Sequence, residues 1–169
     1  PYTTLFRLAS EFRASQQAEL DFSHQGAQLG KARLKGNLDL VELDPKQRSA
    51  RIIDYKTGSS FAAWGRGSAY DQIKSHHYKQ QLLFYAILMR QSRDYATYSV
   101  DHLGIQFVEP NKAGRIVDLT LTPTDEDIKR TEQLIGAVWQ RIMQLDFPDT
   151  SHYEQSVSGI KAFEDDLLA

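Results

Sequence analysis

Two aspartates and a lysine lie where neighbouring strands of a hairpin would bring them together. Asp39 precedes a predicted turn near Pro45–Gln47, and Asp54 and Lys56 follow it. A turn at that point places Asp39 roughly opposite Asp54, and same-face residues on paired strands approach within about 5–8 Å. Because side chains alternate along a strand, Asp54 and Lys56 point to the same face. The sequence therefore predicts a site that holds two carboxylates and one ammonium group.

This group of side chains suits the hydrolysis of a phosphodiester. The reaction needs a hard cation to activate water and to neutralise the charge that builds on the phosphate. Mg²⁺ prefers oxygen ligands and keeps several waters, so Asp39, Asp54 and one backbone carbonyl would suffice to bind it. Lys56 would hold the attacking water or a phosphate oxygen as a point charge. The competing interpretation is a solvated strand face, which is the commoner role of an aspartate and a lysine two residues apart.

The predicted elements place these residues in a mixed α/β domain. Apolar residues recur at helical spacing over 4–15, and apolar and polar residues alternate over 18–24 and 32–43, around a break at Gln25–Gly26. A turn at Asp44–Pro45 then closes a second hairpin onto a strand at 51–56. The remaining elements are a mobile loop at 57–70, a helix at 77–90 packed on the sheet, strands at 98–109 and 116–122, and helices at 125–145 and 159–168. We expect a single domain over residues 1–169, with a mixed central β-sheet of about five strands flanked by helices.

Three motifs, in this order, resemble those of the PD-(D/E)XK nucleases, and within them the RecB-like branch. Gly36-x-x-Asp39 resembles the second motif of that branch, and Asp54-x-Lys56 resembles its signature (D/E)-x-K. The stretch from Gln81 to Tyr85 resembles the downstream Q-x-x-x-Y helix. The motifs reach from residue 36 to residue 85, and their combination is more specific than any one of them. The resemblance implies a restriction-endonuclease-like core.

The resemblance also implies roles for individual residues. Asp39, Asp54 and the backbone carbonyl of Tyr55 would bind Mg²⁺ or Mn²⁺, and Lys56 would position the water. Gln81 and Tyr85, at i and i+4 on one helical face, would contact DNA or position the helix.

RecB-like nucleases carry a further metal ligand, a His or Glu, on a helix before the first strands. Glu11 and Glu19 are the candidates in this sequence, and the motifs do not choose between them. If the chain is trimmed, the ligand lies before Pro1. The absence of cysteine excludes an iron–sulfur cluster.

Several basic and aromatic residues have two interpretations each. Lys31, Arg33 and Lys35 alternate on one strand and either line a DNA groove or face solvent. Trp64 either anchors its loop or stacks on an unpaired base. Lys74, His76, His77 and Lys79 form a basic cluster that fits phosphate contacts or a solvated helix start better than a metal site. We expect the larger aromatic residues in the core, namely Tyr95, Tyr98, Phe107, Trp139 and Phe147.

The composition limits the class of protein. With 41% hydrophobic and 25% charged residues the chain is an ordinary globular one, and no apolar run approaches the roughly 18 residues that would cross a membrane. The lack of cysteine agrees with a reducing, cytoplasmic location. The net charge of −2 means that affinity for nucleic acid is either local to one groove or supplied by a partner.

These observations lead to one leading hypothesis and two alternatives. The leading one is a Mg²⁺- or Mn²⁺-dependent deoxyribonuclease of the exonuclease type, acting at a single-stranded DNA end. The resemblance places it as the C-terminal module of a UvrD/Rep-like helicase–nuclease of recombination and repair, and the start at Pro1 suggests such an excised piece. The alternatives are a catalytically inactive nuclease-fold module that binds DNA or docks a partner, and a stand-alone phage-type or restriction-type nuclease.

Overall fold

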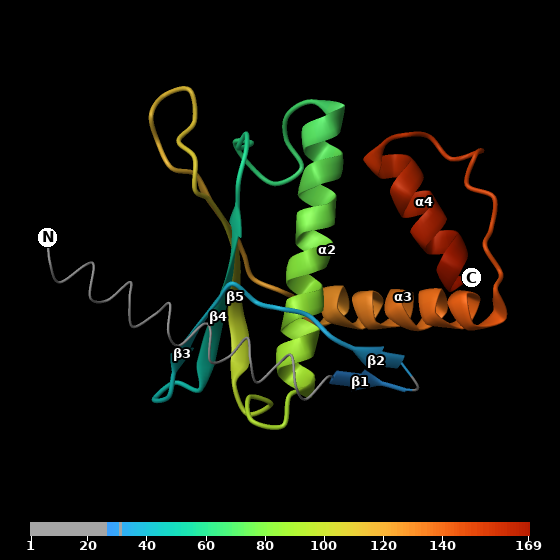
Figure 1. Cartoon of the computed structure of the whole chain (residues 1–169), viewed down its shortest axis with the longest axis horizontal. Coiled ribbons are helices and arrows are strands. Elements are labelled where there is room, and N and C mark those ends of the chain that lie inside the picture. Colours follow the sequence, from blue (N-terminus) through green and yellow to red (C-terminus); the bar gives the residue numbers. More distant parts are fainter. Residues whose placement is uncertain (1–26, 31) are drawn as a thin grey trace, which may run out of the picture.

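The computed structural model describes residues 27–30 and 32–169, so the helix and strand expected at 4–15 and 18–24 lie outside the described residues. A four-stranded sheet forms one layer of the molecule, with the order β3-β4-β5-β6 (Figure 1). Its strands are β3 (Leu40–Asp44), β4 (Ser49–Lys56), β5 (Ser99–Phe107) and β6 (Asp118–Leu121). β4 and β5 are parallel, and the other two pairs are antiparallel. The mixed α/β fold is thereby confirmed.

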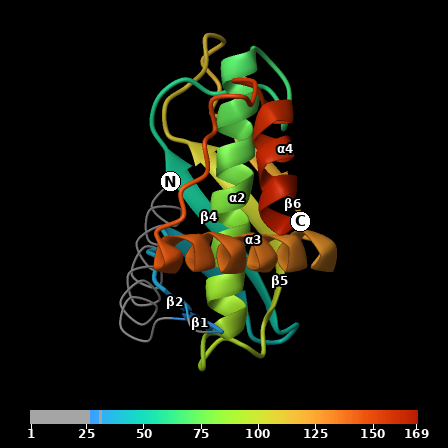
Figure 2. The same cartoon turned by 90° about the vertical axis from the view of Figure 1, so that its right-hand side faces the viewer.

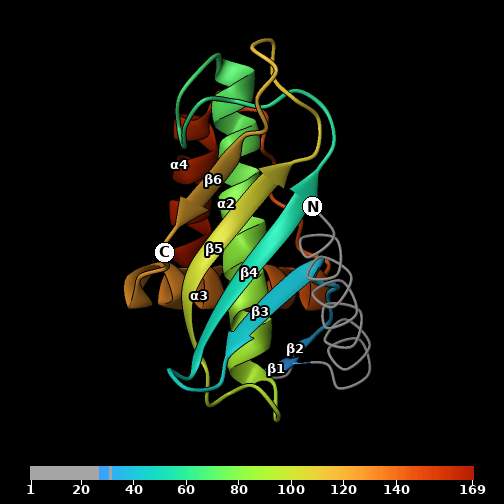
Figure 3. The same cartoon turned by 90° about the vertical axis from the view of Figure 1, so that its left-hand side faces the viewer.

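In the part of the chain that the structure describes, three helices cover the sheet from one side in two further layers. The long helix α2 (Ala69–Gln91) connects the parallel strands β4 and β5 and lies along one face of the sheet. α3 (Asp125–Gln144) and α4 (Val157–Leu168) lie beyond α2 (Figure 1). α3 runs across α2, whereas α4 runs beside it (Figure 2). From the opposite side the strands lie in front of α2 (Figure 3).

The core lies between the sheet and the second half of α2. Ile52 of β4 and Leu103 of β5 are fully buried, and every residue from Tyr85 to Met89 is buried. This half of α2 is apolar on all sides because the sheet covers one face of it and α3 packs against another. The expectation that this helix packs on the sheet is confirmed.

Polar side chains fix where the helices begin. α2 starts with a capping box in which Ser68 accepts from the Asp71 backbone N–H and Asp71 accepts from that of Ser68. Thr124 and Asp127 form the same motif at the start of α3. The predicted start of α2 at His77 is therefore wrong by two turns. The glycines and serines before residue 70 suggested a loop, although the last serine is the cap.

The first hairpin also differs from the prediction. β1 (Ala27–Leu29) pairs with β2 (Ala32–Leu34), so the chain turns at Gly30, with φ +59°. The break expected at Gln25–Gly26 lies outside the described residues. The single strand expected over 32–43 is two strands, because the chain leaves the small two-stranded sheet after β2 and joins the main sheet at β3. Among the described residues, the main sheet thus has four strands, and β1 and β2 form a separate pair.

The loop between β4 and α2 is held in place, whereas the sequence suggested a mobile one. Phe61 is 4% exposed, the Trp64 Nε1–H donates to the Thr120 carbonyl at 2.9 Å, and the Gly65 N–H donates to Ser75 Oγ at 2.9 Å. Trp64 is therefore a loop anchor.

Phe147, expected in the core, is 71% exposed. In the described part of the chain, no helix is long and apolar enough to span a membrane.

Candidate metal centre and active site

Asp39 and Asp54 face each other across the β3–β4 hairpin. Leu40 pairs with Ile53, and one further step in this register sets Asp39 opposite Asp54. The turn forms because Asp44 Oδ1 accepts hydrogen bonds from the backbone N–H groups of Lys46 and Gln47, at 2.8 and 3.1 Å. Asp39 Oδ2 accepts from the Tyr55 N–H at 2.9 Å, so its carboxylate lies against the backbone of β4. The predicted juxtaposition of the two aspartates is present.

Asp54 is a buried carboxylate with an incomplete set of partners. The residue is 2% exposed, and Lys56 Nζ lies 2.6 Å from its Oδ2. That contact is an ion pair without hydrogen-bond geometry, so among the described residues Oδ2 has no hydrogen-bond donor. Burial raises the pKa of Asp54, Lys56 opposes the rise, and the charge of Asp39 adds to it. A second positive charge beside Oδ2 would offset the cost of burying the negative charge of Asp54.

Gln81 joins the strand side of the site to α2. Its Oε1 accepts from Lys56 Nζ at 2.7 Å, and its Nε2 donates to Asp54 Oδ1 at 3.2 Å. Nε2 also donates to the Tyr85 hydroxyl at 2.6 Å. Burial raises the pKa of Tyr85 to about 12, so its hydroxyl stays protonated at neutral pH. One amide therefore holds Asp54, Lys56 and Tyr85 in a single network.

Gly36 allows the chain to reach this site from β2. A Cβ at this position would lie 2.7 Å from Leu88 Cδ1 and 3.2 Å from Phe84 Cε1, both on α2. The segment between β2 and β3 therefore passes against α2 more closely than a side chain would permit. This contact explains the glycine three residues before Asp39.

The oxygen atoms of this site fit a hard divalent cation. Asp54 Oδ2 is buried without a hydrogen-bond donor in the described structure, and Asp39 is an exposed carboxylate beside it. Carboxylate and carbonyl oxygens are the ligands that Mg²⁺ and Mn²⁺ prefer. Within residues 27–30 and 32–169, no three His, Cys, Asp or Glu side chains converge on one point. Glu11 and Glu19 lie outside the described residues.

The basic residues expected at the DNA surface divide into two groups. Arg33 and Lys35 are exposed, and Lys31 lies outside the described residues. Lys74 is near the site, since its Nζ donates to the Ser59 carbonyl at 2.9 Å, three residues after Lys56. Lys79 turns toward α3 instead, where its Nζ lies 2.9 Å from Asp127.

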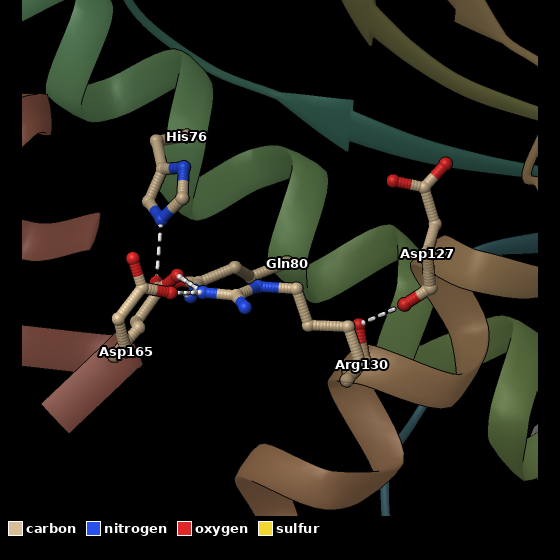
Figure 4. Close-up of polar contacts among 7 residues, drawn as sticks. His76, Gln80, Asp127, Arg130 and Asp165 are labelled. Carbon is tan, nitrogen blue, oxygen red and sulfur yellow. Dashed lines mark hydrogen bonds and ion pairs between the residues drawn. The ribbon is translucent and has the colours of Figure 1, made fainter. Parts of the chain in front are cut away.

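His76 belongs to a polar cluster on the opposite side of α2 from the sheet. Its Nε2 lies 2.7 Å from Glu164 Oε1, which also accepts from Gln80 at 2.5 Å (Figure 4). Arg130 of α3 lies 3.6 Å from Glu164 and 2.5 Å from Asp165. The cluster lines a polar cavity of about 420 Å³ between α2, α3 and α4. These contacts hold the buried Glu164 of α4 on α2. His76 is therefore a structural residue between two helices, and neither a metal ligand nor part of a solvated helix start.

Tyr78 is a site residue that the sequence analysis missed. Lys56 Nζ lies 4.7 Å from the centroid of its ring. Tyr78 precedes Gln81 by three residues and Tyr85 by seven, which is the spacing of one helical face. Helical periodicity extended toward the start of α2 would have found it.

Comparison with known proteins agrees with this geometry. A family model described as the PD-(D/E)XK nuclease superfamily matches residues 3–154. The chain belongs to this superfamily. Proteins of the PD-(D/E)XK nuclease superfamily are generally nucleases and typically use divalent metal ions. The match contains Asp39, Asp54, Lys56, Gln81 and Tyr85 and ends before α4. No curated protein matches the chain.

Proposed function

We propose that this chain is a DNA nuclease domain that hydrolyses phosphodiester bonds with Mg²⁺ or Mn²⁺. The observation that carries the proposal is the continuous network of Lys56, Asp54, Gln81 and Tyr85 beside Asp39. A buried carboxylate, a facing carboxylate and an ammonium group in one place suit metal-assisted hydrolysis of a phosphodiester. Membership of the PD-(D/E)XK nuclease superfamily supports this interpretation.

Asp39, Asp54 and the Tyr55 carbonyl would hold the metal ion, and Glu11 is the candidate for a further ligand. The bound ion would supply positive charge at the phosphate and make a water molecule more acidic. Asp54 is suited to this role because its buried Oδ2 accepts no hydrogen bond from the described residues and is free to bind a cation. The hydrogen bond from the Tyr55 N–H keeps the Asp39 carboxylate turned toward β4.

Lys56 would orient the attacking water or a phosphate oxygen. It is held by Gln81 Oε1 and by the Asp54 charge, so its ammonium group is in place before the substrate arrives. Tyr85 fixes the rotamer of Gln81 through a short hydrogen bond. Gln81 and Tyr85 therefore act on the reaction through the position of Asp54 and Lys56.

DNA would approach over the basic residues near this network. Lys74 lies near it, since its Nζ is 5.6 Å from the centroid of the Tyr78 ring, and Arg33 and Lys35 are exposed on and after β2. We assign phosphate contacts to these three and to Lys31, and not to Lys79, whose charge is paired with Asp127.

We further propose that the domain is part of a longer cytoplasmic helicase–nuclease of DNA recombination and repair, and that it degrades a single-stranded end. The RecB-like motifs and the net charge of −2 support this context. A motor that threads the strand would relieve the nuclease of binding DNA tightly by itself.

The proposal is tested by digestion of end-labelled single-stranded DNA with Mn²⁺, by the chain and by its intact parent protein. Asp54→Ala and Lys56→Ala should each lower the rate at least about a hundredfold, because Asp54 would hold the metal ion and Lys56 would supply positive charge at the reacting phosphate. Glu126→Ala and Lys129→Ala, which remove exposed charges on α3, are the matched controls. Digestion by both site variants at the unaltered rate would refute the assignment.

A second candidate is a nuclease-fold module that binds DNA without cutting it. The observation in its favour is that only two carboxylates converge at the site within the described residues. It predicts that Mn²⁺ leaves the melting temperature unchanged and that DNA binds equally well to Asp54→Ala. A rise in melting temperature with Mn²⁺ that Asp39→Ala or Asp54→Ala abolishes would exclude it.

A further inference from the structure

Tyr78 presents its ring to Lys56 from the same face of α2 that carries Gln81. The Lys56 ammonium lies 4.7 Å from the ring centroid, within the range of a cation–π contact. The ring is itself fixed, because Phe61 stacks on it at 6.1 Å and Phe107 lies 6.5 Å away. Both neighbours are at most 4% exposed. The contact is therefore part of the packed structure between the loop after β4 and the sheet.

The Tyr78 ring gives Lys56 a contact that does not depend on Asp54. Gln81 Oε1 takes one N–H of the ammonium group, and Asp54 Oδ2 is paired with it by charge. If Asp54 also serves as a metal ligand, its charge is shared and its hold on Lys56 weakens. The Tyr78 ring competes for no ligand and stays in place. Lys56 would then remain oriented by Gln81 on one side and by the ring on another.

Lys74 shows that the ring accepts positive charge from a second direction. Its Nζ lies 5.6 Å from the Tyr78 centroid and 5.5 Å from that of Phe107. Two ammonium groups repel one another, and the electron-rich face of an aromatic ring offsets part of that cost. The rings of Tyr78 and Phe107 thus lie against two cations, Lys56 and Lys74.

We propose that Tyr78 is a positioning residue for catalysis, whose aromatic face fixes the Lys56 ammonium group during phosphodiester hydrolysis. The inference rests on the nuclease function proposed above. It assigns the effect to the ring and not to the hydroxyl, because the Tyr78 hydroxyl makes no hydrogen bond with the residues that the structure describes. Burial and the nearby Asp54 charge raise the pKa of Tyr78, which keeps the phenol neutral.

A series of ring substitutions separates the electrostatic role from packing. Tyr78→Phe is the reference, and phenylalanines with one to three ring fluorines at position 78 weaken the negative face in steps with little change of shape. Single-turnover cleavage with Mn²⁺ should fall stepwise, by about three- to thirty-fold for the trifluoro ring, at an unchanged melting temperature. Tyr98→Leu removes another ring that faces a cation, Arg48 at 5.9 Å, and should leave the cleavage rate unchanged. Equal rates across the fluorine series would overturn the proposal.

A second measurement on the metal-free protein does not depend on activity. With lysine labelled by ¹³C at Cε, the Lys56 methylene protons should resonate upfield, because the neighbouring Nζ lies over the Tyr78 ring at 4.7 Å from its centroid. Lys56→Arg and Lys74→Arg assign the two shifted signals. Tyr78→Leu should return the Lys56 signal to the position of exposed lysines, and Tyr78→Phe should not. A Lys56 signal at the exposed-lysine position in the unaltered chain would overturn the proposal even if the chain cuts DNA, and an inactive chain with the shifted signal would refute only the nuclease function.

Discussion

Asp54 and Lys56 should be strongly coupled in their effects on stability. Removing the charge of Lys56 should destabilise the protein, whereas removing the charge of Asp54 should not. Lys56→Met keeps the length of the side chain and deletes its charge, which leaves the Asp54 carboxylate buried without a cation. Asp54→Asn deletes the buried charge itself and keeps an oxygen for Gln81. The first change should lower the free energy of unfolding, and the second should leave it nearly unchanged or raise it.

The size of the coupling follows from distance and burial. At 2.6 Å, Coulomb's law gives about 6 kcal/mol with an effective dielectric constant of about 20 and about 1.6 kcal/mol in water. The side chains are 18% and 3% exposed, so the pair lies between these limits. We expect a coupling energy of about 2–4 kcal/mol, and a fall in the melting temperature of Lys56→Met by about 4–16 °C. In the Asp54→Asn background the same lysine substitution should cost less than about 1 kcal/mol.

The sign of the pH dependence gives a further check. The pKa of Asp54 is raised in the folded protein, mainly by burial, so protonated Asp54 stabilises the fold fully below its ordinary pKa of 3.8. That stability is lost as the pH rises through the folded pKa. Lys56→Met removes a group that lowers this pKa, so the loss extends to higher pH. The difference between Lys56→Met and the unaltered chain should be small at acid pH and largest at neutral pH.

Urea unfolding followed by circular dichroism, with EDTA present, measures all four free energies of the cycle. Each variant is compared at about pH 7 and at the lowest pH at which it remains folded. A coupling energy below about 0.5 kcal/mol, or a destabilisation by Lys56→Met that does not shrink toward acid pH, would refute the reasoning.

Three further predictions concern the packing of Gly36, the Tyr85 hydroxyl and the attachment of α4. Gly36→Ala should destabilise the fold by about 1–3 kcal/mol, because its Cβ would lie 2.7 Å from Leu88 Cδ1 of α2. Gly136→Ala in α3, where a Cβ would meet no atom within 4 Å, should stabilise the fold by about 0.5–1 kcal/mol. Thermal unfolding measures both changes, and changes of the opposite sign would contradict the packing argument. Tyr85→Phe should lower the cleavage rate roughly tenfold with a small change in stability, because it frees Gln81; an unchanged rate would show that the hydroxyl does not matter. Glu164→Gln should weaken the attachment of α4 and raise the rate of amide hydrogen exchange in α4 alone. An exchange rate in α4 equal to that of the unaltered chain would mean that apolar contacts alone hold this helix.

The sequence by itself determined the residues of the site and most of the elements that carry them. The turn chemistry of Asp44 and the alternation along 51–56 were enough to place Asp39, Asp54 and Lys56 together, whereas Gln81 and Tyr85 came from the resemblance to the PD-(D/E)XK nucleases. These signals are local, since a strand repeats every second residue and a helix about every fourth. The structure brings these five side chains to one site, and their catalytic roles stay a prediction.

Contacts between distant segments decided the rest. The alternating pattern over 32–43 could not reveal that the chain changes sheets at Gly36, because that break is set by Phe84 and Leu88 of α2. The partner of His76 is Glu164, 88 residues later, and the ring over Lys56 comes from another element. The burial that raises the pKa of Asp54 likewise exists only once α2 covers the sheet. Sequence periodicity fixes which face a residue occupies, whereas the groups that meet that face follow from packing.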